Sequence, residues 1–143
     1  MLTESKNSVV VNFGSGTVTS LEYERCLLER KNQFVIASAG VGAGMEGKVY
    51  TLSEVENPNW YLVFPHKLAY SIGSNNNYLE IGIGGLFVQG NTTQPYLAYP
   101  TLGYRFIGNN KTTFKFYLSW PLSGIETNDL GFVPVGLSLG QFF

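Results

Sequence analysis

The chain has 143 residues, a formal net charge of −1, 13% charged residues and 44% hydrophobic residues. This length allows one domain, residues 1–143, and hardly two. The near-neutral charge gives no electrostatic argument for a nucleic-acid partner, and no apolar run approaches the roughly 18 residues that a membrane-spanning helix needs. Few charges, 17 glycines and 15% aromatic residues suit either a soluble all-β protein or a membrane β-barrel.

Short runs of β-type residues, separated by turn residues, follow one another along the chain. After a short N-terminal segment of about residues 1–7, which we expect to be disordered, the alternation predicts eight strands. They cover residues 8–13, 17–28, 33–44, 60–72, 78–88, 95–107, 112–122 and 131–143. The first strand has the weakest pattern. A helix competes with the second, because Leu21, Arg25 and Leu28 also fit a helical stripe.

The stretch 131–143 shows the alternation most clearly. Val133, Val135, Leu137 and Leu139 share one face, and the other face carries mostly glycine and serine. A face of small side chains suits the crowded interior of a barrel, and a face of bulky aliphatic side chains suits contact with lipid. This pattern is typical of a strand in a transmembrane β-barrel.

The connections between the predicted strands alternate in length. Those at 29–32, 73–77 and 108–111 are short and polar, whereas those at 45–59, 89–94 and 123–129 are mostly longer. Outer-membrane barrels have an even number of strands, short periplasmic turns and longer external loops. The sequence therefore predicts an all-β fold, an eight-stranded antiparallel up-and-down transmembrane β-barrel.

Six charged residues fall on the face opposite the large hydrophobic side chains: Glu22, Glu24, Lys67, Glu80, Arg105 and Lys115. Three acids balance three bases. Eight strands enclose an interior that side chains just fill, and buried charges are tolerable there when they are paired. We therefore expect an ion-pair network that plugs the lumen. The alternative is that these residues are solvated faces of soluble strands.

Aromatic residues gather near both ends of the predicted strands. The set near the longer loops is Trp60, Tyr61, Tyr96, Tyr99 and Trp120, and the set near the short turns is Tyr70, Tyr78, Phe106, Phe114, Phe142 and Phe143. Two aromatic girdles around an aliphatic band are expected at the two membrane interfaces.

Several stretches, in the same order along the chain, resemble small outer-membrane β-barrel proteins of Bacteroidetes-type bacteria. They are residues 20–25 (SLEYER), 39–42 (AGVG), 64–70 (FPHKLAY), 79–84 (LEIGIG), 103–106 (GYRF) and 134–140 (PVGLSLG). One departure is Ser38, where an arginine is expected in many relatives.

This resemblance implies a monomeric barrel in the bacterial outer membrane, surrounded by outer-membrane lipids and lipopolysaccharide, and brings no agreed activity. It also implies that Phe143, at the end of the last strand, is read by the outer-membrane insertion machinery. Residues 1–7 contain no apolar region of a signal peptide, so an export signal would already have been removed.

Residues for catalysis or metal binding are scarce. His66 and Cys26 are each the only residue of their type, and the carboxylates show no metal-ligand spacing. We therefore expect no catalytic residues, metal site or cofactor, and a structural or surface-interaction role. One alternative is a lipid acyltransferase or phospholipase that would pair His66 with Ser71 or Ser119. Another is a soluble, lipocalin-like barrel whose hydrophobic face would point inward around an apolar ligand.

Overall fold

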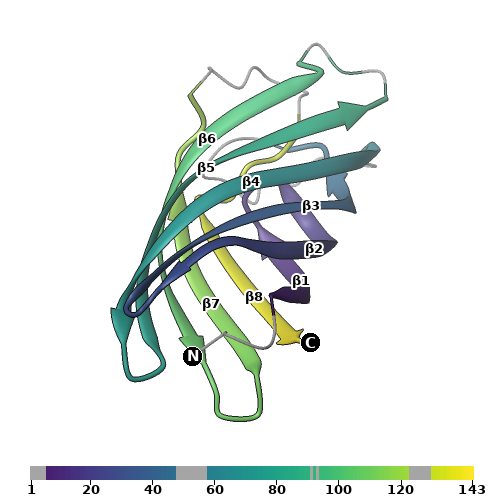
Figure 1. Cartoon of the computed structure of the whole chain (residues 1–143). Helices are drawn as coiled ribbons and strands as arrows, with labels where there is room; N and C mark the ends of the chain where they lie inside the picture. The colour runs from purple at the N-terminus through teal and green to yellow at the C-terminus, as the bar shows by residue number, and fades with distance from the viewer. Residues whose placement is uncertain (1–5, 48–57, 91, 93, 123–129) are drawn as a thin grey trace.

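A computed structural model describes residues 6–47, 58–90, 92, 94–122 and 130–143, and these form eight antiparallel strands in a closed barrel (Figure 1). The strands are β1 (Asn7–Gly14), β2 (Thr17–Arg30), β3 (Gln33–Met45), β4 (Trp60–Ser74), β5 (Asn77–Gln89), β6 (Tyr96–Ile107), β7 (Thr112–Ser119) and β8 (Val135–Phe142). In that part of the chain there is no helix that is long and apolar enough to cross a membrane.

Each strand pairs with its sequence neighbour, and β8 pairs with β1, with Ser8 opposite Phe142. This closure leaves none of the eight described strands with an unpaired edge. The start of β1 and the end of β8 lie at the end of the barrel that holds the β2–β3, β4–β5 and β6–β7 turns, which we call the short-turn end (Figure 1). The opposite end, from which the longer connections leave, is the long-loop end.

The eight predicted strands are confirmed, including the weak first strand and the strand interpretation of residues 17–28. Two predicted boundaries are wrong: β7 ends at Ser119 and β8 begins only at Val135. Pro121 and Pro134 lie in the excluded segments, and proline has no backbone N–H to donate to a neighbouring strand. The expected disorder falls mainly on residues 1–5, outside the described residues, whereas Asn7 already begins β1.

The turn between β4 and β5 consists of Asn75 and Asn76, whose φ angles are 50° and 72°. Two consecutive positive φ angles match the twist of a two-residue β-hairpin, and asparagine tolerates them better than most residues. The polar stretch in the sequence therefore forms a tight reversal.

Inward-pointing side chains fill the barrel in three layers. At the short-turn end an apolar layer is formed by Cys26, Phe34, Ile36, Ile107 and Phe142. At the long-loop end a second apolar layer contains Tyr61, Val63, Leu86, Val88, Leu97, Tyr99, Leu130 and Phe132. Between these layers lie buried charged side chains and hydroxyl groups, among them Glu24, Lys67, Glu80, Arg105 and Lys115. The lumen is thus filled by the protein itself.

The outward-pointing side chains are mostly large and apolar. Along β4, for example, every second residue from Leu62 to Ile72 is exposed, and most of these residues are apolar, while the residues between them are buried. The lipocalin-like alternative required this hydrophobic face to point into the barrel, and the structure places it on the outside. The prediction of an inward hydrophobic face is therefore wrong.

Candidate functional site

Arg105 on β6 is the centre of the buried polar layer. Its side chain is 0% exposed and reaches two carboxylates on different strands. Nε donates a hydrogen bond of 2.7 Å to Glu80 Oε2 on β5, and Nη1 and Nη2 donate to the two carboxylate oxygens of Glu24 on β2, at 2.9 and 3.2 Å. A bidentate pair of this kind is among the stronger polar contacts in proteins. One guanidinium therefore links opposite parts of the barrel wall.

Two lysines complete this group. Lys115 on β7 donates to Glu24 Oε1, and Lys67 Nζ on β4 lies 3.8 Å from Glu80 Oε1 and 4.9 Å from the centre of the Tyr117 ring. The ion pairs thus run in the order Lys115, Glu24, Arg105, Glu80 and Lys67, a set that we call the lumen network. The structure brings together five of the six charged residues that the sequence placed inside.

Glu22, the sixth residue, is buried but belongs to no ion pair among the described residues. Its carboxylate accepts hydrogen bonds from Ser20 Oγ at 3.2 Å and from Ser38 Oγ at 3.1 Å. Ser38 is the position where the family resemblance implies an arginine. In this chain, hydroxyl groups therefore solvate a carboxylate for which a cation would otherwise be expected.

Sequence reasoning missed the hydroxyl groups that support the lumen network. Ser8 Oγ donates to Glu24 Oε2 at 3.0 Å, and Ser71 Oγ donates to Glu80 Oε2 at 3.1 Å. Both serines are fully buried. Each carboxylate of the network therefore has a neutral donor in addition to its cations, which lowers the cost of burying it. The available signal was the inward parity of these serines within their strands.

Four of the aromatic residues assigned to girdles lie inside the barrel. Tyr61 and Tyr99 belong to the apolar layer at the long-loop end, Phe142 belongs to the layer at the short-turn end, and Tyr78 packs partly buried against that layer. The girdle prediction is wrong for these residues, because it used their nearness to a strand end and ignored which face they occupy.

The other girdle residues lie on the outer face. Trp60, Tyr96 and Trp120 are exposed near the long-loop end, and Tyr70, Phe106, Phe114 and Phe143 are exposed near the short-turn end.

A repeated hydrogen bond at the short-turn end was not foreseen. Tyr23 on β2, Tyr70 on β4 and Tyr104 on β6 each donate their hydroxyl to a side-chain amide oxygen on the preceding strand. The acceptors are Asn7, Gln33 and Asn77, the first residues of β1, β3 and β5. We call these three pairs the tyrosine–amide ring. An aromatic body with a satisfied polar tip suits a boundary between an apolar and a polar medium.

His66 lies on the outer face in the middle of β4. Its Nε2 is 2.9 Å from the hydroxyl of Tyr96 on β6, and its Nδ1 is 3.3 Å from the carbonyl oxygen of Phe64. The two side chains meet across Gly85 of β5, where an added Cβ would come within 2.4 Å of His66 Nε2. Ser71 and Ser119 are buried on the inner face, so His66 forms a catalytic pair with neither.

In the described ranges no group of three or more His, Cys, Asp or Glu residues could hold a metal ion. Cys26 is buried in the apolar layer of the short-turn end. The polar centre of this molecule is thus the lumen network, whose groups bind one another.

Comparisons with protein-family models, with curated proteins and with solved structures found no match to this chain. The feature of the molecule that bears most directly on its function is the contrast between a charged lumen and an apolar outer wall.

Proposed function

We propose that this protein is an integral β-barrel of the bacterial outer membrane, with a closed lumen and a structural or surface-interaction role. The observation that carries the proposal is that apolar side chains cover the outside of the wall while charged side chains are buried within it. The outward residues Val11, Leu21, Val41, Leu68, Ile81, Leu102, Phe116 and Leu137, one from each strand, are between 37% and 59% exposed.

A hydrophobic surface of this extent needs a covering. Soluble monomers rarely expose contiguous apolar patches of more than a few hundred Å². Here the apolar surface continues around the barrel, and none of the eight described strands has a predominantly charged outer face. A lipid bilayer is the covering that fits a closed ring, because a single protein partner would cover only one side.

The backbone also suits a bilayer. In a hydrocarbon medium every backbone N–H and C=O group must find a partner within the protein, and a closed barrel provides this. Strands β2 to β6 have 12 to 15 residues, more than the roughly 9–11 that a tilted strand needs to span a membrane. Outer-membrane lipids and lipopolysaccharide would surround this wall, and the insertion machinery would deliver the chain to them.

The filled lumen supports the second part of the proposal. Arg105, Lys115, Phe132 and Phe142 are among the largest fully buried side chains, and they belong to all three layers of the interior. A solute path would have to break ion pairs and displace two apolar layers. We therefore propose that the strands anchor the protein in the membrane and hold the long-loop end at the membrane surface. Contacts with other envelope components would be made by that end.

The test is the folding of the purified chain from urea into detergent micelles and into phospholipid vesicles. A closed membrane barrel is expected to migrate differently on a gel before and after boiling, and to stay with the vesicles after a carbonate wash. Vesicles loaded with a fluorescent ion indicator should remain tight. A monomer that is soluble without detergent would refute the membrane assignment, and rapid ion entry would refute the closed lumen.

A further inference from the structure

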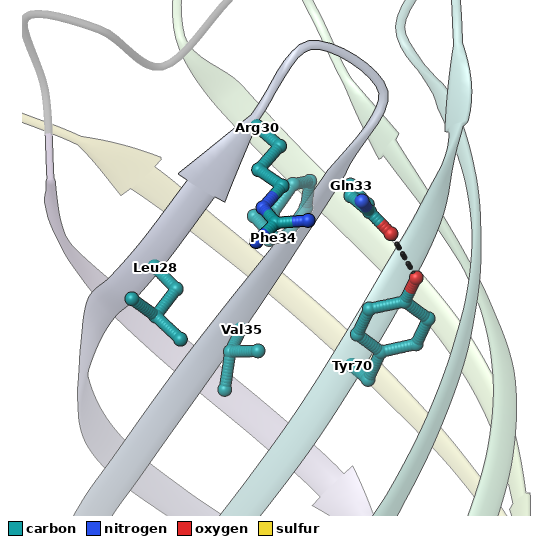
Figure 2. A pocket seen from close by; sticks show the side chains of 6 residues that line it. All are labelled: Leu28, Arg30, Gln33, Phe34, Val35 and Tyr70. Carbon is teal, nitrogen blue, oxygen red and sulfur yellow. Dashed lines mark hydrogen bonds between the residues drawn. The ribbon is translucent and has the colours of Figure 1, made fainter.

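A pocket of about 190 Å³ lies on the outer wall beside the β2–β3 turn (Figure 2). It is lined by Leu28, Arg30, Gln33, Phe34, Val35 and Tyr70. Figure 2 shows Arg30 and Gln33 at the turn end of the pocket, and Leu28, Val35 and Tyr70 further along the strands. The pocket is therefore amphipathic along the strand direction, with its polar groups nearest the short-turn end.

A β-bulge creates this shape. The register between β2 and β3 shifts between Cys26 and Leu28, so Leu27 and Leu28 are both exposed on the outside. Beyond the bulge Leu28 pairs with Val35, which pairs with Tyr70, and Arg30 pairs with Gln33. Without the bulge the alternation would turn Arg30 toward the lumen. The shift instead puts a cation and an apolar surface on the same outer face.

The polar groups of the pocket can serve an external partner. None of the ion pairs in the described part of the chain involves Arg30. Tyr70 donates its hydroxyl to Gln33 Oε1, which orients the Gln33 side chain and leaves its Nε2 as a donor. The neighbouring carboxylate, Glu29, is paired with the inward residue Phe34 and so lies on the opposite face of the sheet from Arg30.

The charge around the pocket is positive. The described residues at the short-turn end include the bases Lys6, Arg25, Arg30, Lys31 and Lys111, and Glu29 is their only acidic side chain outside the lumen network. Basic side chains beside an apolar membrane surface attract anionic lipid. The pocket is thus the point at which the basic rim meets the apolar wall.

Resting on the membrane location proposed above, we propose that this pocket binds one anionic phospholipid of the leaflet at the short-turn end. The Arg30 guanidinium and the Gln33 amide donate hydrogen bonds to the lipid phosphate. Leu28, Val35 and the ring of Tyr70 contact the first part of an acyl chain. The fork of donors on arginine matches phosphate oxygens, and the small volume accommodates a chain segment rather than a folded partner.

The experiment uses the full chain folded in detergent with equal amounts of phosphatidylglycerol and phosphatidylcholine of the same acyl chains. Native mass spectrometry then counts the lipids that remain bound. We expect the unmodified chain to retain one phosphatidylglycerol in preference to phosphatidylcholine. Arg30→Gln should lower that retention about tenfold, because it removes a charge-assisted hydrogen bond to the lipid phosphate. Gln33→Glu, which keeps the shape and the acceptor for Tyr70, should also lower it by opposing the phosphate.

The matched control is Arg25→Gln, which removes the same charge from the outer face of β2 at a residue that does not line the pocket. Its retention should stay within about twofold of the unmodified chain. Equal losses in Arg30→Gln and Arg25→Gln would overturn the site and leave only diffuse attraction. Displacement of the lipid by millimolar inorganic phosphate would also overturn it, since the acyl contacts would then contribute nothing.

Each variant is first checked for heat-modifiable migration, because a chain that does not fold in detergent cannot report on the pocket. If the unmodified chain lacks that behaviour, the proposed membrane function fails and this inference fails with it. If the chain folds and inserts but shows no lipid preference, the inference alone is wrong.

Discussion

The inner and outer faces of the same strands are built for different surroundings. On β2, Glu22 and Glu24 point inward and are buried, whereas Leu21 and Tyr23 on the same strand point outward and are 53% and 46% exposed. A soluble barrel has the opposite arrangement, since water stabilises charge and expels hydrocarbon. In this chain the buried charged residues of the lumen network pair with one another, and the exposed residues of the strands are mostly apolar. The contrast between the two faces therefore bears on which medium surrounds the barrel.

The two faces also differ in how much they depend on specific partners. The carboxylates inside have defined donors from several strands, as Glu24 has from Arg105, Lys115 and Ser8. In the proposed membrane location, most outward side chains would need only an apolar environment. We therefore expect inner substitutions to act by breaking particular contacts, and outer substitutions to act according to depth along the strand.

The largest effect should come from Arg105→Met. The substitution keeps an unbranched, flexible side chain and removes the cation that both Glu24 and Glu80 share, leaving buried carboxylates with fewer counterions. Loss of one partner from a buried ion pair costs about 3–5 kcal/mol. The free energy of unfolding by urea in lipid vesicles measures it. Arg25→Met, on the outer face of β2, is the control and should change that value by less than about 1 kcal/mol. Equal effects of the two would show that the lumen network does not stabilise the barrel.

A charge introduced on the outer face tests whether lipid or water surrounds the barrel. Ile83 is the central residue of β5 and points outward, and Gln89 ends the same strand on the same face. In a bilayer Ile83→Arg should cost about 2–4 kcal/mol and Gln89→Arg only about 0–1 kcal/mol, because the penalty falls toward the interface. Unfolding in vesicles gives both values. An unchanged or increased stability for Ile83→Arg would indicate that this face meets water.

Glu22 and Glu24, two carboxylates on β2, allow the contribution of ion pairs to stability to be compared with that of hydrogen bonds from serine hydroxyls. Glu22→Gln leaves the four ion pairs intact and alters only contacts with Ser20 and Ser38, so we expect a loss of about 1 kcal/mol. Glu24→Gln should cost several-fold more, because it removes the charge that faces Arg105 and Lys115. Urea titrations in parallel compare the two. Similar losses would mean that Glu22 also depends on a cation.

The smallest effect should come from the tyrosine–amide ring. Tyr104→Phe removes the hydroxyl that bonds Asn77 and should cost about 0.5–1 kcal/mol, the usual net value of a hydrogen bond. A double-mutant cycle with Asn77→Ala isolates that contact. A coupling energy near zero would mean that water replaces the bond, and that this ring does not mark the boundary of the apolar surface.

The sequence alone determined the strand number, the faces and the inward position of the charges. These are local properties, because side chains alternate with a period of two residues and each run reports its own parity. Glu22, Lys67 and Arg105 could be placed on the inner face in this way, and so could the aliphatic residues of β8 on the outer face.

The tertiary structure alone decided which groups meet. Arg105 contacts Glu24 across 81 positions of the chain, a pairing set by barrel closure and register. The bulge after Cys26 reversed the parity at Arg30, and Phe132 enters the lumen from a segment outside the regular strands. Tyr61 lies inside because parity outweighs nearness to a strand end. Alternation is a property of each strand, whereas partners depend on how all the strands are aligned, and a single extra residue changes that alignment.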